Sequence, residues 1–377
     1  MQTTHIRWTS DRHWVGDAHL LDADLVLAFG DAPYFQSPEC FQALRQRYPR
    51  ALIVGCSSSG SVQGEAISDG DVVATAVRLD HGRVRMAAAH LDGGETSIRE
   101  LAANLMSRLK APDLRHVLVF SDGLLVNGSD LAAGLNGYGV SVTGGLAGDG
   151  TRFGKTWVVA DAPARPAAIA AVGLYGDISV KSGCFAGWQE FGAERIVTRS
   201  GGNGVMEIDN RPALPLYKKY LGELAAELPG SGLRFPLSVR ASKDEQPVIR
   251  TLLGVDEAAQ SLTFAGDVPQ GHLCKLMKTN LDRLIENAGL AAGAAKHRGS
   301  SPLGESSPAG LCLVVSCVGR RLVLGQLTEE EIEVVQDTLG ERTAITGFYS
   351  YGELAPFSDI QHCRLHNQTM TLTTIYE

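Results

Sequence analysis

Three apolar stretches of this chain run directly into glycine- and serine-rich turns, and this repeated pattern limits the fold more than any other feature. The stretches lie at residues 51–60 (ALIVGCSSSG), 140–150 (VSVTGGLAGDG) and 343–353 (TAITGFYSYGE). Glycine adopts backbone conformations with positive φ and leaves main-chain N–H groups open to a ligand. No nucleophile, base or metal cluster of recognisable spacing accompanies these turns. They therefore predict a binding protein with two related halves rather than an enzyme.

The composition is that of a folded protein with a large core. The chain has 377 residues, of which 44% are hydrophobic and 20% charged, and this length predicts two domains. A net charge of −8 with scattered Lys and Arg argues against a nucleic-acid partner. The sequence has no stretch of 18 apolar residues and no recognisable secretory leader, so neither a membrane span nor export is expected. Because the seven cysteines are irregularly spaced, the expected compartment is the cytoplasm.

Helical and strand patterns alternate along both halves. Residues 25–29 and 51–56 read as buried strands on either side of a helix that begins after Ser37. Residues 72–79 and 84–91 flank a turn signal and are expected to form a hairpin. The glycine-rich run at residues 201–204 reads as the seam between the halves.

The expected fold class is therefore α/β. We predict two mixed α/β domains, residues 1–204 and 205–377, each with a mostly mixed or antiparallel sheet covered by helices. The glycine-rich turns are expected near the domain interface. In the second half, Thr328 and Glu331 are spaced as a capping box at a helix start, and residues 329–331 are expected to be solvated.

These turns resemble the FIST sensory family of bacterial signal transduction. The N-terminal half is similar to the FIST N pattern at residues 53–60 and 144–149. The C-terminal half is similar to the FIST C pattern at residues 264–271, 317–320, 347–353 and 366–371. The motifs are specific together, although each alone is a short glycine pattern, and the resemblance covers residues 25–377.

The resemblance implies a bacterial cytoplasmic small-ligand sensor that lacks an output module of its own. Its partner would be a histidine kinase of a two-component system, or a diguanylate cyclase or phosphodiesterase. A stand-alone subgroup of similar length binds haem and senses nitric oxide, so haem b with this gas as the signal is the leading expectation. The alternatives are an amino acid or another small metabolite as the ligand. A homo-oligomer is compatible with either.

The candidate ligand-binding residues lie on or just after the strand-to-glycine turns. A polar run directly after a buried strand faces the carboxyl end of that strand, where open α/β sheets bind ligands. Tyrosine adds a ring that packs and a hydroxyl that donates. The competing interpretation is that these turns only pack between sheet and helix. The predicted residues at these turns are Cys56, Ser57, Ser58, Gly145, Asp149, Tyr349, Ser350, Tyr351 and Glu353, and Asn367 is added from the segment that resembles the FIST C pattern.

His362 and His366 are the alternative haem-iron ligands. Haem needs one neutral imidazole facing an apolar pocket, whereas two histidines four apart on a strand lie about 13 Å apart, too far for one metal. Hydrogen-bonded structural histidines are the competing interpretation. Residues 57–59 could supply a serine nucleophile, but the G-x-S-x-G elbow of hydrolases does not occur at this turn. We therefore predict no catalytic residue, with a serine-dependent hydrolase and a ligand-free scaffold as the competing hypotheses.

Overall fold

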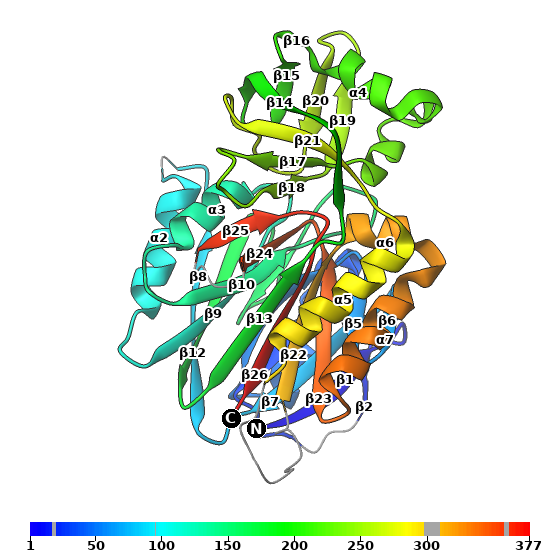
Figure 1. Cartoon of the computed structure of the whole chain (residues 1–377). Coiled ribbons are helices and arrows are strands. Elements are labelled where there is room, and N and C mark those ends of the chain that lie inside the picture. Colours follow the sequence, from blue (N-terminus) through cyan, green and yellow to red (C-terminus); the bar gives the residue numbers. More distant parts are fainter. Residues whose placement is uncertain (17–19, 95, 298–309, 358–361) are drawn as a thin grey trace, which may run out of the picture.

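The computed structural model describes residues 1–16, 20–94, 96–297, 310–357 and 362–377. These residues form four β-sheets with helices on their outer faces (Figure 1), so the mixed α/β class predicted from the sequence is confirmed. Among them, no helix is both long and apolar enough to cross a membrane.

Three six-stranded sheets make up the body of the molecule. Sheet 1 has the order β11 (Val158–Ala160), β4 (Leu52–Ser57), β3 (Leu25–Gly30), β7 (Val72–Arg78), β1 (Gln2–Trp8) and β2 (Trp14–Gly16). Sheet 2 has the order β25 (Cys363–His366), β24 (Gly352–Pro356), β10 (Ser141–Leu146), β9 (Leu114–Ser121), β12 (Ala168–Gly176) and β8 (Gly82–His90). Sheet 3 has the order β13 (Ser179–Phe185), β26 (Met370–Tyr376), β22 (Gly310–Cys317), β23 (Thr343–Ser350), β5 (Ser61–Gln63) and β6 (Ala66–Ser68).

The three sheets repeat one arrangement. Each has a central parallel pair, β3/β4, β9/β10 or β22/β23, whose strands are joined through helices. Beside each pair run two antiparallel strands, which are β7 and β1, β12 and β8, or β26 and β13. The helices of these connections are α1 (Glu39–Arg47), α3 (Gly128–Leu135), and α6 (Val318–Leu324) with α7 (Thr328–Leu339). The chain thus holds three equivalent units, where the sequence predicts two related halves.

The units are linked in a ring by strand exchange. In each unit, at least one further strand lies between the second parallel strand and the antiparallel strand that follows it in the chain. The first such strand pairs with a strand of another unit. Strand β5 of the first unit pairs with β23 of the third, β11 of the second with β4 of the first, and β24 of the third with β10 of the second. Each unit therefore completes the sheet of another.

One glycine recurs at the same register position in each parallel pair. Added Cβ atoms at Gly55, Gly144 and Gly347 would lie only 1.7, 1.8 and 1.9 Å from carbonyl oxygens of the neighbouring strand. Such contacts are far inside the van der Waals limit, so only glycine allows the strands to approach this closely. The three glycine-rich motifs of the sequence therefore mark the three repeated units.

The three sheets share one apolar core. Phe29 from sheet 1, Phe120 from sheet 2 and Phe348 from sheet 3 are fully buried, and their ring centroids lie 4.8–6.1 Å apart. Aromatic contacts at these distances add to the burial energy of each ring. The outer faces of the sheets are covered by α1, by α2 (Ile98–Leu109) with α3, and by α5 (Leu281–Ala295) with α7.

An eight-stranded sheet forms an upper lobe, which we define as residues 189–278. It is inserted into the third unit between β13 and α5 and stands above the body in Figure 1. Its strand order is β18 (Val248–Arg250), β17 (Leu237–Arg240), β21 (Leu273–Lys278), β14 (Gln189–Gly201), β15 (Gly204–Ile208), β20 (Ser261–Phe264) and β19 (Leu252–Asp256), and β16 (Arg211–Pro212) pairs with β15. Its helical segments are α4 (Ala213–Leu221) and the 3₁₀ turns η2 (Gly222–Glu227) and η3 (Gly230–Arg234).

One local prediction fails because a turn signal does not say which strands pair. The predicted hairpin of residues 72–79 and 84–91 does not form, since β7 belongs to sheet 1 and β8 to sheet 2. The glycine run at residues 201–204 is the turn between the paired strands β14 and β15 of the upper lobe. The domain division at residue 204 stays a prediction, and strands from both sides of it pair within sheets 2 and 3 and the upper lobe.

Candidate functional site

A cavity of about 530 Å³ lies between the upper lobe and the body. The body contributes the loop after β9, the ends of β10 and β22, and the residues that follow β23 and β25. The upper lobe contributes the turn that carries η3, the junction of β18 and β19, and residues 265–267. The carboxyl ends of parallel strands thus meet at this cavity, as in ligand sites of open α/β sheets.

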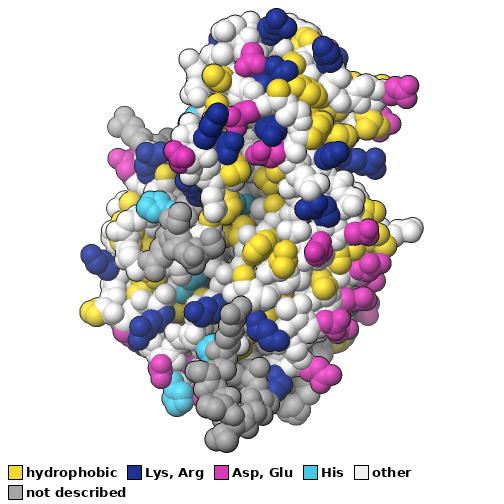
Figure 2. Space-filling view, viewed as in Figure 1, with side chains coloured by type: hydrophobic (Ala, Val, Ile, Leu, Met, Phe, Trp, Pro, Cys, Tyr) yellow, Lys and Arg dark blue, Asp and Glu magenta, His cyan; other side chains and the backbone are white. Residues whose placement is uncertain are grey.

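Exposed apolar side chains gather at the cavity. In the described part of the chain, nine large apolar side chains are exposed, and five of these line the cavity with exposed fractions of 38–59%. These five are Leu124, Leu125, Phe153, Leu253 and Leu322. Figure 2 shows hydrophobic side chains along the junction of lobe and body on the face that it presents. Apolar groups gathered in this way are typical of a binding site.

The cavity wall also holds a polar group without a partner. Asn367 is fully buried, and neither its Nδ2 nor its Oδ1 has a hydrogen-bond partner. The Thr251 hydroxyl, on the side of the upper lobe, is 4% exposed and also lacks a partner. Buried polar atoms are nearly always paired, because an unpaired one costs about 1–3 kcal/mol. These two side chains are therefore the first candidates for contact with a ligand.

Tyr351 lines the cavity and contacts the loop of residues 149–153. Its ring stacks on Phe153 with centroids 4.8 Å apart, and its hydroxyl donates to the Asp149 carboxylate and, at 3.0 Å, to the Gly150 carbonyl. Burial and the neighbouring carboxylate raise the pKa of this phenol. Although burial opposes it, hydrogen bonds from Tyr351 and from the N–H groups of Lys155 and Gly154 lower the pKa of Asp149. Asp149 therefore shapes the loop that carries Phe153, and its side chain does not line the cavity.

A second acidic residue shapes the loop after β9. The Asp122 carboxylate is buried and accepts from the N–H groups of Leu124, Leu125 and Ala167 at 2.7–2.8 Å. These bonds hold the turn so that both leucine side chains line the cavity. This loop was not among the predicted sites, although the sequence carries a signal for it, a pair of leucines placed directly after a strand and its terminating Asp-Gly.

The residues predicted on the first two glycine turns lie inside the body. Cys56 and Gly145 are enclosed by the common core, where Gly145 sits under Val315 and Phe348. The Ser57 hydroxyl accepts from the N–H of Trp157 at 3.0 Å, and the Ser58 and Ser61 hydroxyls are 2.9 Å apart. None of these predicted residues lines the 530 Å³ cavity. Their assignment as ligand contacts stays a prediction.

Tyr349, Ser350 and Glu353 are buried and hydrogen-bonded to other side chains, and none of the three lines the cavity. The Tyr349 hydroxyl donates to Glu331 at 2.8 Å, and the Ser350 hydroxyl donates to Glu353 at 2.7 Å. The Glu353 carboxylate also accepts from the Thr369 hydroxyl and N–H at 2.7 and 3.2 Å. Since Thr369 follows Asn367 by two residues, Glu353 fixes the segment that forms part of the cavity wall.

Glu331 corrects the expectation of a solvated helix start. It is fully buried, and its carboxylate pairs with the equally buried Arg320 at 2.8 Å. Arg320 also donates to the carbonyls of Ala186 and Leu284 at 2.7 and 2.9 Å. The predicted capping box does not form, because the Thr328 hydroxyl donates to backbone carbonyls of the preceding turns. The spacing of residues around Glu331 does not show that its carboxylate is buried, because burial depends on the ion pair with the buried Arg320.

The two histidines predicted as alternative haem ligands lie in different surroundings. His362 is exposed and lines a separate cavity of about 320 Å³, whereas His366 is buried. His366 Nε2 donates to the Ala355 carbonyl at 3.1 Å, and burial lowers the pKa of His366 to about 4. Within the described ranges, no group of three or more His, Cys, Asp or Glu side chains could hold a metal ion. The assignment of either histidine as a haem-iron ligand stays a prediction.

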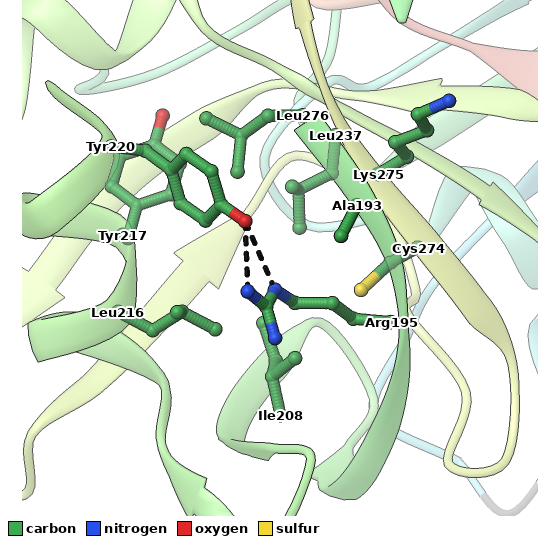
Figure 3. Close-up of a pocket in the computed structure, with 10 residues that line it drawn as sticks. All are labelled: Ala193, Arg195, Ile208, Leu216, Tyr217, Tyr220, Leu237, Cys274, Lys275 and Leu276. Carbon is green, nitrogen blue, oxygen red and sulfur yellow. Dashed lines mark hydrogen bonds between the residues drawn. The ribbon is translucent and has the colours of Figure 1, made fainter. Parts of the chain in front are cut away.

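A small void inside the upper lobe has no room for a ligand. It measures about 10 Å³, close to the space of one water molecule. Figure 3 shows Arg195 and Tyr220 pointing toward one another across it, and the Arg195 guanidinium donates to the Tyr220 hydroxyl at 2.9 and 3.2 Å. This contact stabilises the lobe itself.

Comparison with models of known protein families shows to which family the chain belongs. Residues 24–211 match the FIST N domain and residues 213–356 match the FIST C domain, so the chain belongs to the FIST family. FIST domains are sensor domains that recognise small ligands in signal transduction. The resemblance noted in the sequence is thereby confirmed at the level of the family.

The relatives add no named activity. Two uncharacterized proteins of Mycobacterium tuberculosis, from strains CDC 1551 / Oshkosh and ATCC 25618 / H37Rv, are each 26% identical over 352 residues, which covers 89% of this chain and 87% of theirs. A crystal structure of a chorismatase aligns with 100% of this chain and 98% of its own at 10% identity and a TM-score of 0.36. A score this low carries no argument about fold or function.

Proposed function

We propose that this protein is a sensor that binds a small, mostly apolar and uncharged ligand in the 530 Å³ cavity and reports its presence to a partner protein. One observation carries the proposal. Five of the exposed large apolar side chains in the described ranges gather at a cavity whose wall holds Asn367, a buried amide without a partner. Sensing of small ligands is the role of FIST domains, which supports the same conclusion.

The charge of the wall argues for an uncharged ligand. Among the described residues that line the cavity, none is Lys, Arg or His, and Asp267 is the only carboxylate. An anion placed there would lose hydration without gaining a cationic partner. Haem carries two carboxylates and an amino acid carries one, so both fit this wall less well than a neutral metabolite does.

A serine hydrolase has no support in the geometry. The hydroxyls of Ser57, Ser58 and Ser59 are buried, and each is hydrogen-bonded to backbone or to another hydroxyl. A serine nucleophile needs an adjacent base and access to substrate. We therefore propose a binding role and no catalysis at this turn.

The placement of the cavity supports a conformational signal. Its walls come from the upper lobe and the body, which the chain joins only through the β13–β14 and β21–α5 connections. The lobe and the body can stand in an open or a closed arrangement, and a ligand that contacts both walls favours the closed one. The partner protein then distinguishes the closed arrangement from the open one. The proposed partner is a histidine kinase or an enzyme of cyclic-di-GMP turnover.

Binding of the uncharged dye Nile red to the purified chain tests the proposal. We expect saturable fluorescence enhancement, and Leu125→Asp should weaken it at least fivefold because it places a charge on the apolar wall. Leu290→Asp is the matched control, since Leu290 is similarly exposed (50% against 59%) but lies on α5 away from the cavity. Equal dye affinity in the wild type and Leu125→Asp would refute the proposal.

The haem expectation has its own test. The absorption spectrum after haem addition would show a sharp Soret band that shifts with nitric oxide if haem were the sensing group. On the present proposal we expect no saturable Soret band in the wild type. A stoichiometric band lost in His366→Ala would overturn the assignment of an uncharged ligand.

A further inference from the structure

Asn367 lines the cavity and carries a donor and an acceptor that are both unpaired. Its Nδ2 and Oδ1 are both without partners, and the residue is fully buried. A group that satisfies both atoms at once must itself carry an adjacent acceptor and donor. A primary carboxamide or a lactam, in which C=O and N–H lie on the same side, has this pattern.

The chain holds Asn367 in place from both sides and leaves its own amide free. On one side, His366 donates to the Ala355 carbonyl. On the other, the Gln368 side chain donates to the Leu233 carbonyl of the upper lobe at 3.1 Å, and the Gln368 carbonyl accepts from the Trp188 indole at 3.1 Å. The site is thus rigid before any ligand arrives, which lowers the entropy cost of binding.

The electrostatics of the wall separate an amide from a carboxylate. A carboxylate offers two acceptors and no donor, so it would leave Asn367 Oδ1 facing a like partial charge. The only charged side chain among the described lining residues is Asp267, which repels anions. A ketone or ester offers an acceptor alone and leaves Oδ1 unpaired, which costs affinity.

We propose that Asn367 recognises an amide edge, so that the ligand is an uncharged apolar molecule that carries a primary carboxamide or a lactam. The inference rests on the proposed function, because it assigns the polar contact within the same cavity. The Thr251 hydroxyl supplies a second polar contact from the upper lobe. A ligand that bonds to both side chains joins the two walls directly.

Calorimetric titration of the full-length chain at neutral pH tests the proposal with three probes that share one ring system. They are 2-naphthamide, 2-acetylnaphthalene and 2-naphthoate. We expect 2-naphthamide to bind about 10–100-fold more tightly than either of the others, the range that one buried hydrogen-bonding edge provides. Asn367→Leu should reduce its affinity to that of 2-acetylnaphthalene within twofold, and Leu290→Asp should change nothing.

A second variant keeps the test decisive if Asn367→Leu fails to fold. Asn367→Asp replaces the donor by a second acceptor, so it should bind 2-naphthamidine, whose two N–H groups match a carboxylate, in preference to 2-naphthamide. Two results would overturn the inference: equal affinity of the wild type for 2-naphthamide and 2-acetylnaphthalene, or a folded Asn367→Asp that does not prefer 2-naphthamidine. If Nile red still binds to the wild type, the proposed function stands in either case. Loss of Nile red binding in the wild type would overturn both.

Discussion

The buried carboxylate of Glu353 makes stability depend on pH. Glu353 is fully buried, and burial raises its pKa from 4.5 to about 7, outweighing the hydrogen bonds from Ser350 and Thr369 and the charge of Arg320. Between these two values the folded protein holds a proton that the unfolded chain has released. Stability due to this group is therefore complete below pH 4.5 and is lost as the pH rises through 7.

The magnitude follows from the two pKa values. A tenfold change in proton affinity corresponds to about 1.4 kcal/mol, so ionising Glu353 costs the folded state roughly 3 kcal/mol at full effect. Most of that cost, roughly 2.5 kcal/mol, develops between pH 5 and pH 8. The variant Glu353→Gln carries an uncharged side chain of the same shape and should not incur it.

Urea unfolding at pH 5 and pH 8 measures the effect. We expect the free energy of unfolding of Glu353→Gln, relative to the wild type, to rise by roughly 2.5 kcal/mol between the two conditions. Glu333→Gln controls for the loss of a negative charge, since Glu333 is exposed on α7. If the wild type and Glu353→Gln change in parallel, the carboxylate does not carry the burial cost assigned to it.

Three further substitutions test other parts of the structure. Asn367→Leu should raise the free energy of unfolding of the ligand-free protein by about 1–2 kcal/mol in urea titrations, because it removes a buried amide without partners; a lower midpoint would contradict the assignment. Gly144→Ala should lower thermal stability by about 3 kcal/mol or more, since its Cβ would lie 1.8 Å from the Val119 carbonyl oxygen at a φ of +148°, and a melting temperature near that of the wild type would argue against the close strand approach. Arg320→Met should cost about 3–5 kcal/mol because it leaves the Glu331 carboxylate buried without a cationic partner, and adding Glu331→Leu should recover much of the loss in the same assay.

Local pattern was sufficient for elements whose partners lie close in sequence. The strands at residues 25–29 and 51–56 and the helix between them correspond to β3, β4 and α1, a parallel pair joined through its own helix. Their apolar runs are local, so the sequence contains what is needed. Pairing across the turn at residues 80–82 is not local. There the N–H groups of Asp80 and Gly82 donate to the Glu377 side chain at the end of the chain, where one unit passes to the next.

The candidate site was predictable only in part. Tyr351 was expected from the strand-to-turn pattern and Asn367 from the segment that resembles the FIST C pattern, and both line the cavity. Thr251 and Leu253 were not, because the wall that they form belongs to an inserted lobe whose placement depends on the whole body. The polar residues at the first two glycine turns resemble ligand contacts in sequence, yet they satisfy one another and the backbone inside the body.

The three units are arranged like the subunits of a trimer, but one polypeptide joins them. The two ends of the chain lie close together where the third unit meets the first, and the amino terminus is 3.2 Å from the Glu377 carboxylate (Figure 1). In an assembly of three identical subunits, every mutation would fall on all the interfaces at once. Here each interface between units has its own sequence. One place in the structure could therefore acquire the inserted lobe and the cavity, while the equivalent places in the other units stayed closely packed. Covalent linkage thus frees a symmetric architecture to specialise at a single place.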